Sequence, residues 1–185
     1  MRCVGLDLSL SSTGIATSHD SHRIRTSEDW PMLRRLRVIR RGVETACRGA
    51  DAIVVEGPSF GSRFGKSHER AGCWWLVVER LEAVTTAGIA VIPPKSLKVF
   101  AVGNGNAEKA EVVRAARYHF GDRIQGDDTA DATFCAAAGY AALGEPLVQL
   151  PPEHTRGLAS LVWLRPCDLA SVRFRDAARA LGGAR

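Results

Sequence analysis

Four acidic residues set among apolar segments can do chemistry if the fold brings them together. Asp7 interrupts the apolar run that follows the N-terminus, and Glu56 ends a second short apolar run. Asp128 and Asp131 stand three residues apart at the start of an Ala-rich segment, so on a helix they share one face. An ionised carboxyl group removed from water needs a partner or a cation, and packing alone does not supply one for Asp7.

A cluster of carboxylates is a natural site for divalent cations. Mg²⁺ and Mn²⁺ prefer oxygen ligands, and two such ions about 4 Å apart can activate a water, orient a phosphodiester and stabilise its leaving oxygen. A structural alternative stays open for the Ala-rich segment, because Asp127, Asp128 and Asp131 also suit a helix N-terminus as caps and dipole partners. For Asp7 the alternative is a strand position at an edge of the sheet, open to water.

The apolar patterns indicate the elements that would position these acids. Residues 2–9, 14–18 and 22–26 are typical of three antiparallel strands. An amphipathic helix begins after Pro31; its predicted buried face is Leu33, Leu36, Ile39, Val43 and Cys47, and its predicted basic face is Arg34, Arg35, Arg37, Arg40 and Arg41. Later segments predict parallel strands at 51–57 and 88–94 and helices at 70–87, 107–120 and 127–144.

The order βββαβαβαα predicts an α/β fold, with a mixed five-stranded sheet of three antiparallel strands and then parallel strands, flanked by helices on both faces. Strand ends and helix N-termini meet at one edge of such a sheet, which allows all four acids to converge. The pattern weakens after Pro151, where a basic segment holds a predicted helix near Thr155 to Leu164. We therefore expect a catalytic domain over residues 1–146 and a basic, partly helical extension over 147–185.

Composition limits the class of protein. The 185 residues are 45% apolar and 24% charged, as in a soluble single domain, and the net charge of +5 leans towards a polyanionic partner. Neither a membrane span nor a signal peptide is evident, so a cytoplasmic protein without membrane contact is expected. Five widely spaced cysteines with apolar neighbours predict reduced core residues, and the five histidines lack metal-ligand spacing.

Residues 57–70, "GPSFGSRFGKSHER", combine glycines with cations and aromatic rings. This mixture suits a distorted or unpaired nucleic-acid strand, since stacking on a ring adds about 1–3 kcal/mol per base. The alternative is a surface loop whose phenylalanines pack back on the core. The candidate DNA-binding residues in this segment are Phe60, Arg63, Phe64, Lys66 and Arg70.

A second basic segment, "VGNGNAEKAEV", places Gly103 and Gly105 before a helix whose predicted N-cap is Asn106. Lys109 then lies in the first helical turn, where the dipole disfavours a cation, and a phosphate bound there would explain it. An ordinary solvated lysine is the alternative. Farther along the chain, Trp75 widens the apolar stripe of Trp74, Val77, Val78, Leu81 and Val84, which predicts either core packing or a two-fold helix interface.

Four segments, in this order and spacing, resemble the RuvC family of Holliday junction resolvases in the ribonuclease H-like superfamily. They are "VGLDLSLSSTGIA", "AIVVEGPSF", "PPKSLKVFAVGNGNAEKAEV" and "DDTADATFCAAAGY", and the likeness covers about residues 3–143. The third segment carries the resemblance as strongly as the acids do. The setting implied is bacterial, such as an actinobacterium, or a phage acting in its host cytoplasm.

The resemblance implies what the acids and cations do. Asp7, Glu56, Asp128 and Asp131 correspond to four catalytic acids that bind two Mg²⁺ or Mn²⁺ ions, and Lys109 and Lys98 to basic residues that contact DNA near the scissile phosphate, with Lys95 beside them. Members of the family are homodimers that nick two symmetric strands of a four-way junction, leaving 5′-phosphate and 3′-hydroxyl ends. The family has an aromatic residue where this chain has Ser59, so Phe60 or Phe64 must replace it.

Two other functions remain as alternatives. An actin-like kinase also begins with a strand, an aspartate and hydroxyls, but it needs a second phosphate hairpin and about twice this length. A catalytically silent protein of the same fold that binds branched DNA would gain nothing from clustered acids near a polyanion. Metal-dependent nicking separates the enzyme from the silent binder.

Overall fold

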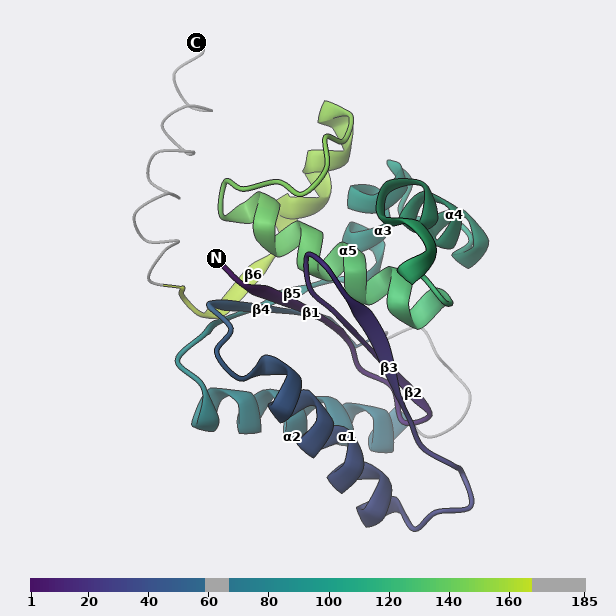
Figure 1. Ribbon diagram of the computed structural model, residues 1–185, viewed down its shortest axis with the longest axis vertical. Helices are drawn as coiled ribbons and strands as arrows, with labels where there is room; N and C mark the ends of the chain where they lie inside the picture. Colours follow the sequence, from purple (N-terminus) through teal and green to yellow (C-terminus); the bar gives the residue numbers. More distant parts are fainter. Residues whose placement is uncertain (59–66, 168–185) are drawn as a thin grey trace.

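The computed structural model describes residues 1–58 and 67–167, which form a central sheet covered by helices on both faces (Figure 1). The strands are β1 (Cys3–Asp7), β2 (Ser12–Ala16), β3 (Ser21–Arg25), β4 (Ala52–Glu56), β5 (Gly88–Ile92) and β6 (Val162–Arg165). The helices are α1 (Met32–Cys47), α2 (Ser67–Val84), α3 (Pro94–Val102), α4 (Lys109–Phe120) and α5 (Asp127–Ala142), with 3-10 turns η1 (Gly121–Arg123) and η2 (Pro152–Ser160).

The sheet is mixed, with the strand order β3-β2-β1-β4-β5-β6. The first three strands are antiparallel neighbours, β1, β4 and β5 are parallel, and β6 closes the far edge antiparallel to β5. Helices α3, α4 and α5 cover one face and α1 and α2 the other (Figure 1). The predicted α/β class, the antiparallel start and the two helical layers are therefore confirmed.

Alternation along the strands divides the core into two clusters. Val4 and Leu6 of β1 pack towards α1 and α2, whereas Cys3 packs towards α5. All five cysteines are free and buried, as predicted for core residues. Within residues 1–58 and 67–167, no helix is both long and apolar enough to cross a bilayer.

Helix α5 lies unusually close to the sheet because glycines face it. A Cβ atom added to Gly5 would come within 2.0 Å of the Ala132 carbonyl oxygen, and one added to Gly14 within 2.0 Å of the Asp128 carbonyl oxygen. Both obstacles are helix backbone, which cannot step aside as a flexible side chain can. Gly14 also pairs with Asp7 in the ladder between β1 and β2. The absence of a side chain at Gly5 and at Gly14 therefore lets the start of α5 approach the end of β1.

Gly14→Ala is expected to destabilise the protein by about 3 kcal/mol or more, because the methyl group pushes α5 off the sheet. The matched control is Gly72→Ala in α2, where nothing lies within 4 Å of the added Cβ atom. This control should gain about 0.5–1 kcal/mol from helix propensity. Urea unfolding monitored by circular dichroism measures both changes. Equal stability of the two variants would contradict the close packing of α5.

Two predictions about the secondary structure were wrong in detail. The sheet has six strands rather than five, and the helix predicted near Thr155 to Leu164 is η2 followed by β6. Residues of β6 alternate, with Trp163 packed against the core and its neighbours exposed, and that period of two is a strand pattern. The guanidinium of Arg165 then ties β6 to the Ala87 carbonyl oxygen at 2.6 Å.

Helix α3 was not predicted, because Pro93 and Pro94 were assigned to the end of the preceding strand. Pro94 instead occupies the first turn of α3, where a missing N–H is harmless.

The predicted buried face of α1 was wrong at the start of the helix. Leu33 is 74% exposed, whereas Arg35 is buried on the stripe that continues through Ile39 and Val43. Arg35 lies four residues before Ile39, so the two residues share the face of α1 that packs on the core. Leu33 was predicted to be buried from its apolar side chain alone, and its position on the helix turns it to solvent.

Candidate active site

Strand register brings Asp7 and Glu56 together. Each is the last residue of its strand, and the parallel pairing of Leu6 with Val55 makes the two acids neighbours at one edge of the sheet. Because side chains alternate along a strand, Asp7 points to the same face as Gly5, towards α5. The sequence predicted this convergence with Glu56 at the end of its strand and Asp7 inside a strand of residues 2–9, whereas in the structure β1 ends at Asp7.

Asp131 of α5 completes a group of three carboxylates, which we call the acid triad: Asp7, Glu56 and Asp131. Carboxylate oxygens from the three residues all lie within 4.8 Å of one another, and the side chains are only partly exposed. The close packing of α5 on Gly5 and Gly14 is what allows this approach. Three acids from two strands and one helix, far apart in the sequence, therefore face one small volume.

The electrostatics of the acid triad are unfavourable without a cation. Burial, followed by repulsion from Asp131, raises the pKa of Asp7 to about 7. Burial, followed by the charge of Asp7, raises the pKa of Glu56 well above its ordinary value. Burial raises the pKa of Asp131 to about 6, although the positive charge of Lys109 opposes the rise. Protonation relieves the repulsion among these acids, and a bound cation would relieve it in the same way.

The acid triad fits a divalent metal site by its donor set and by its energetics. Hard oxygen ligands converge, and each of the three acids has a raised pKa that a cation would reverse. Within residues 1–58 and 67–167, no other group of three metal-ligating side chains is as close.

Asp128 shares a helix face with Asp131 but its carboxylate lies outside the acid triad. It accepts a hydrogen bond from the Ser12 hydroxyl at 2.5 Å and lies 3.9 Å from the Arg23 guanidinium. Both partners come from the antiparallel strands β2 and β3, on the other side of β1 from Glu56. The predicted set of four acids thus appears as three together and a fourth held beside them.

Three residues that support the site were not predicted to do so. The Trp74 indole N–H donates to the Glu56 carbonyl oxygen at 2.8 Å, which fixes the end of β4. The buried guanidinium of Arg35 donates to the Leu10 carbonyl oxygen at 2.9 Å, in the loop after β1. Ser12 holds Asp128. The sequence signals were an arginine on the buried stripe of α1 and a cluster of hydroxyls after Asp7, but neither names its partner.

Lys109 lies beside the acid triad and is paired with another acid. Its ammonium donates to the Asp127 carboxylate at 2.6 Å, and this bond raises the pKa of Lys109 and lowers that of Asp127. The unfavourable position of a cation at the start of α4 is thus offset by a carboxylate at the start of α5. Lys98 of α3 is half-buried and donates to the Ala107 carbonyl oxygen at 2.7 Å.

The predicted N-cap of α4 was wrong. The cap is Glu108, whose backbone N–H donates to the Glu111 carboxylate at 2.7 Å in a capping box. The acid pair at a spacing of three residues outcompetes Asn106, which lies exposed in the preceding turn. The turn therefore leaves Asn106 on the surface.

The remaining predicted DNA-binding residues fall into two groups. Lys95 in α3 and Arg70 in α2 are exposed. Phe60, Arg63, Phe64 and Lys66 lie outside the described residues. Trp75, on the outer side of α2, is 61% exposed, in contrast to its buried neighbour Trp74.

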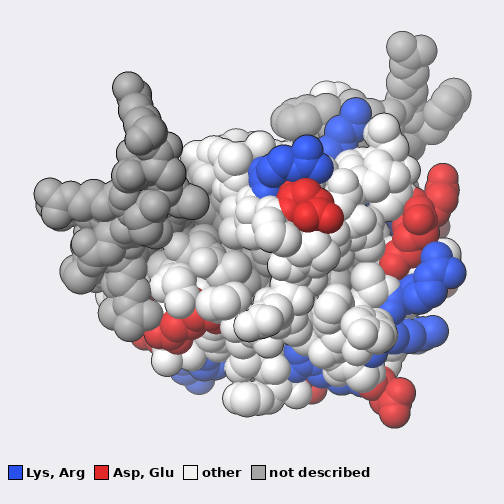
Figure 2. Space-filling model, turned by 90° about the horizontal axis from the view of Figure 1, so that it is seen from above, with Lys and Arg blue, Asp and Glu red and all other residues white. Residues whose placement is uncertain are grey.

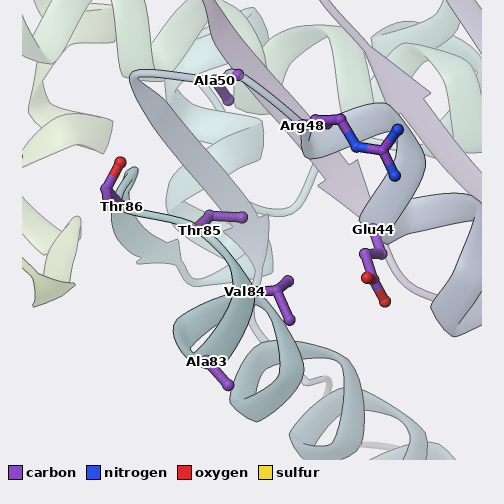
Figure 3. Close-up of a pocket in the computed structure, with 8 residues that line it drawn as sticks. Glu44, Arg48, Ala50, Ala83, Val84, Thr85 and Thr86 are labelled. Carbon is purple, nitrogen blue, oxygen red and sulfur yellow. The ribbon is translucent and has the colours of Figure 1, made fainter.

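A separate cavity of about 390 Å³ lies between the ends of α1 and α2 (Figure 3). Glu44, Arg48, Val84 and Thr85 are among its lining residues. It adjoins the starts of β4 and β5, so it lies at the opposite edge of the sheet from the acid triad. Among the described residues that line it, Glu44 is the single acid, so this cavity does not repeat the ligand set of the acid triad.

No family model matches the chain, and no curated protein sequence is similar to it. Solved structures are similar in fold. The structure of Thermus thermophilus RuvC matches with a TM-score of 0.62 at 20% sequence identity, covering 78% of this chain and 98% of that one. The structure of Thermus thermophilus RuvC in complex with a Holliday junction substrate matches with a TM-score of 0.65 at 22% identity, covering 78% and 97%. The chain therefore has the fold of RuvC, a mixed sheet between two layers of helices, as its sequence motifs imply.

Proposed function

We propose that the protein is a divalent-metal endonuclease that resolves four-way DNA junctions by paired nicks, with 5′-phosphate and 3′-hydroxyl products. The observation that carries this proposal is the acid triad at the edge of a RuvC-like sheet. Three buried like charges destabilise a protein unless they serve a bound cation. The likeness to a RuvC structure that holds a Holliday junction substrate supports branched DNA as the substrate.

In this proposal Asp7, Glu56 and Asp131 hold one or two Mg²⁺ or Mn²⁺ ions, and Asp128 serves as an outer ligand. The bound ions supply a Lewis acid for the phosphodiester and an activated water. Lys109 contributes positive charge at the mouth of the site, since its charge already acts on all three acids of the triad. Ser12 and Arg23 orient Asp128 from the neighbouring strands.

We propose DNA-binding residues from the sequence motifs, and the exposure of Lys95, Asn106 and Arg70 supports three of them. Lys95 and Lys98 on α3 and Asn106 before α4 lie on the elements that lead to Lys109. Arg70 on α2, with Phe60, Arg63, Phe64 and Lys66 of the preceding segment, is proposed to contact the distorted strands. Residues 1–146 form the proposed catalytic domain and 147–185 its extension, which contributes η2 and β6 to the described fold.

The test is cleavage of an end-labelled synthetic four-way junction, beside a flap and a linear duplex of the same sequence. Each substrate is incubated with Mg²⁺, Mn²⁺ or a chelator. Symmetric paired nicks confined to the junction support the resolvase. Metal-dependent cutting of all branched forms would make the protein a broader debranching nuclease. Tight junction binding with no cutting at any metal concentration would overturn the enzyme and leave the silent binder.

We further propose that the active form is a homodimer joined through the outer face of α2. Trp75 is 61% exposed and Leu76 is 44% exposed, so the outer face of α2 presents two large apolar side chains that a second copy of the helix would bury. A two-fold dimer also presents two equivalent sites to a junction with two equivalent strands.

Trp75→Glu is expected to convert the dimer to a monomer, because the new carboxylate would be buried without a partner in the interface. The apparent dissociation constant of the dimer should rise by at least about 100-fold, as for a central aromatic side chain. Sedimentation equilibrium measures the change. The control is Tyr118→Glu, which alters an aromatic residue that is 84% exposed on α4, on the other face of the sheet. A dimer that survives Trp75→Glu would place the interface elsewhere.

A further inference from the structure

The outer face of α1 carries a line of exposed arginines without an acidic partner among the described residues. Arg34, Arg37 and Arg41, which we call the arginine ridge, are exposed. Their spacing of three and four residues keeps them on one side of the helix. Arg34 and Arg41 are seven positions apart, so at about 1.5 Å of rise per residue they are separated by about 10 Å along the helix.

Within the described part of the chain, no carboxylate neutralises the arginine ridge. Among residues 1–58 and 67–167, no acid lies within 4.0 Å of a ridge guanidinium nitrogen. The single acid of α1, Glu44, is engaged by Arg80 of α2 at 3.2 Å. The surface seen from above in Figure 2 differs, because it is mostly uncharged and its few basic side chains are scattered. Helix α1 therefore presents a continuous row of cations to solvent.

One end of the ridge is held in place. The Arg34 guanidinium stacks over the Trp30 ring at 4.2 Å from the ring centroid. This stacking fixes a long side chain in the first turn of α1, where the helix dipole disfavours a cation and no acid is present. A guanidinium that is already ordered loses less entropy when it binds an anion.

The ridge begins at the edge of the sheet that holds the acid triad. Both β1 and β3 are antiparallel to β2, so β3 ends at the same edge as β1, and α1 starts there. The hydrogen bond from Arg35 to the Leu10 carbonyl oxygen confirms that the start of α1 lies against the loop after Asp7. From this edge the helix runs beneath the sheet to the opposite edge (Figure 1).

We propose that the arginine ridge binds the phosphates of a duplex DNA arm that leads away from the acid triad. This inference rests on the proposed function for the identity of the polyanion. Phosphates of one strand recur about every 3.4 Å along the axis, so a ridge of about 10 Å matches about three of them. Guanidinium groups bind phosphate oxygens in pairs without reading bases, so this binding is independent of sequence.

The test measures duplex binding as a function of salt. Arg37→Gln/Arg41→Gln removes two ridge cations and leaves Arg34 on Trp30. Arg114→Gln/Arg156→Gln is the matched control, since both arginines are exposed on other elements. Fluorescence anisotropy with a labelled duplex of about 30 base pairs is recorded between about 50 and 200 mM NaCl. The slope of log K against log salt should become shallower by about 1.8 for the ridge variant, because each phosphate that a cation neutralises contributes about 0.9.

That change means that raising the salt about fourfold weakens wild-type binding about 12-fold more than it weakens the ridge variant. The control variant should keep the wild-type slope. Equal slopes for wild type and ridge variant would overturn the inference, as would equal losses in ridge and control variants. Melting temperature guards against misfolding, since removing cations from α1 should leave it unchanged or raise it.

Failure of the ridge and failure of the proposed function can be told apart. Junction nicking by the wild type tests the proposed function, and the difference in salt slope between wild type and ridge variant tests the inference. A protein that binds duplex through the ridge but never nicks would retain this inference and lose the proposed function. A protein that nicks normally while the ridge variant keeps the full salt slope would retain the proposed function and lose the inference.

Discussion

Asp7→Asn is expected to slow metal-dependent junction cleavage by a factor of at least about 10²–10³, because Asp7 belongs to the acid triad that is proposed to hold the catalytic ions. An amide cannot supply the negative charge that holds a cation. Bound metal ions stabilise the transition state by several kcal/mol, and each loss of about 1.4 kcal/mol slows the reaction about tenfold. Asp7 interacts with both other acids of the triad, Glu56 on the neighbouring strand and Asp131 on α5. Single-turnover cleavage of the labelled junction measures the loss.

Binding and folding should survive this substitution. Removing a negative charge near a polyanion leaves junction affinity in chelator unchanged or stronger. The matched control is Asp122→Asn, an exposed acid in η1, which should cleave at the wild-type rate. Glu56→Gln should behave like Asp7→Asn. Full cleavage by either triad variant would show that these acids are not the metal ligands and would return them to a structural role.

The second large effect is an inverted pH dependence of stability in chelator. Raised pKa values mean that the folded triad keeps protons that the unfolded chain releases, with the pKa of Asp7 at about 7 and that of Asp131 at about 6. Unfolding therefore releases protons between about pH 4 and pH 7, and stability falls as the pH rises through this window. A pKa shift of one unit changes the free energy of unfolding by about 1.4 kcal/mol. The melting temperature of a chain of this size changes by about 2–4 °C per kcal/mol.

The melting temperature of the metal-free protein should accordingly drop by about 5 °C or more between about pH 5 and pH 8. Asp7→Asn removes one of the repelling charges, so at the upper end of this range in chelator it should melt higher than wild type. The comparison between wild type and this variant isolates the triad. His119 works in the opposite direction, because burial lowers its pKa and its share of stability is gained as pH rises towards neutrality.

Divalent metal should cancel the drop. At about pH 8, saturating Mg²⁺ or Mn²⁺ binds the folded state and raises the melting temperature of wild type, and the gain should be smaller in Asp7→Asn. The melting temperature is measured by differential scanning fluorimetry with Mg²⁺ or Mn²⁺, with chelator and with Ca²⁺. A melting temperature that rises with pH in chelator, together with no response to metal, would refute the acid triad as a shared metal site.

Local sequence pattern was sufficient for the elements that place the acids at the edge of the sheet. A period of two with apolar runs located β1, β4 and β5, and a period near 3.6 located α1, α2, α4 and α5. Because parallel strands end at the same edge, Asp7 and Glu56 could be expected to meet from their positions along the chain. Asp131 followed from its place in the first turns of α5. These conclusions need only neighbours along the chain and the general geometry of sheets.

Interactions between distant segments decided the rest. The Gly14 position against α5 sets how closely Asp131 approaches, and Ser12 with Arg23 holds Asp128 outside the acid triad. Arg35 belongs to the buried stripe because the Leu10 carbonyl oxygen accepts its hydrogen bond in the interior. The local sequence pattern cannot predict these contacts, because the energy of each contact depends on a partner from a distant segment of the chain. The sequence by itself therefore determined which acids gather at which edge, and the tertiary structure decided which carboxylates touch, because burial and hydrogen bonding are properties of the packed chain.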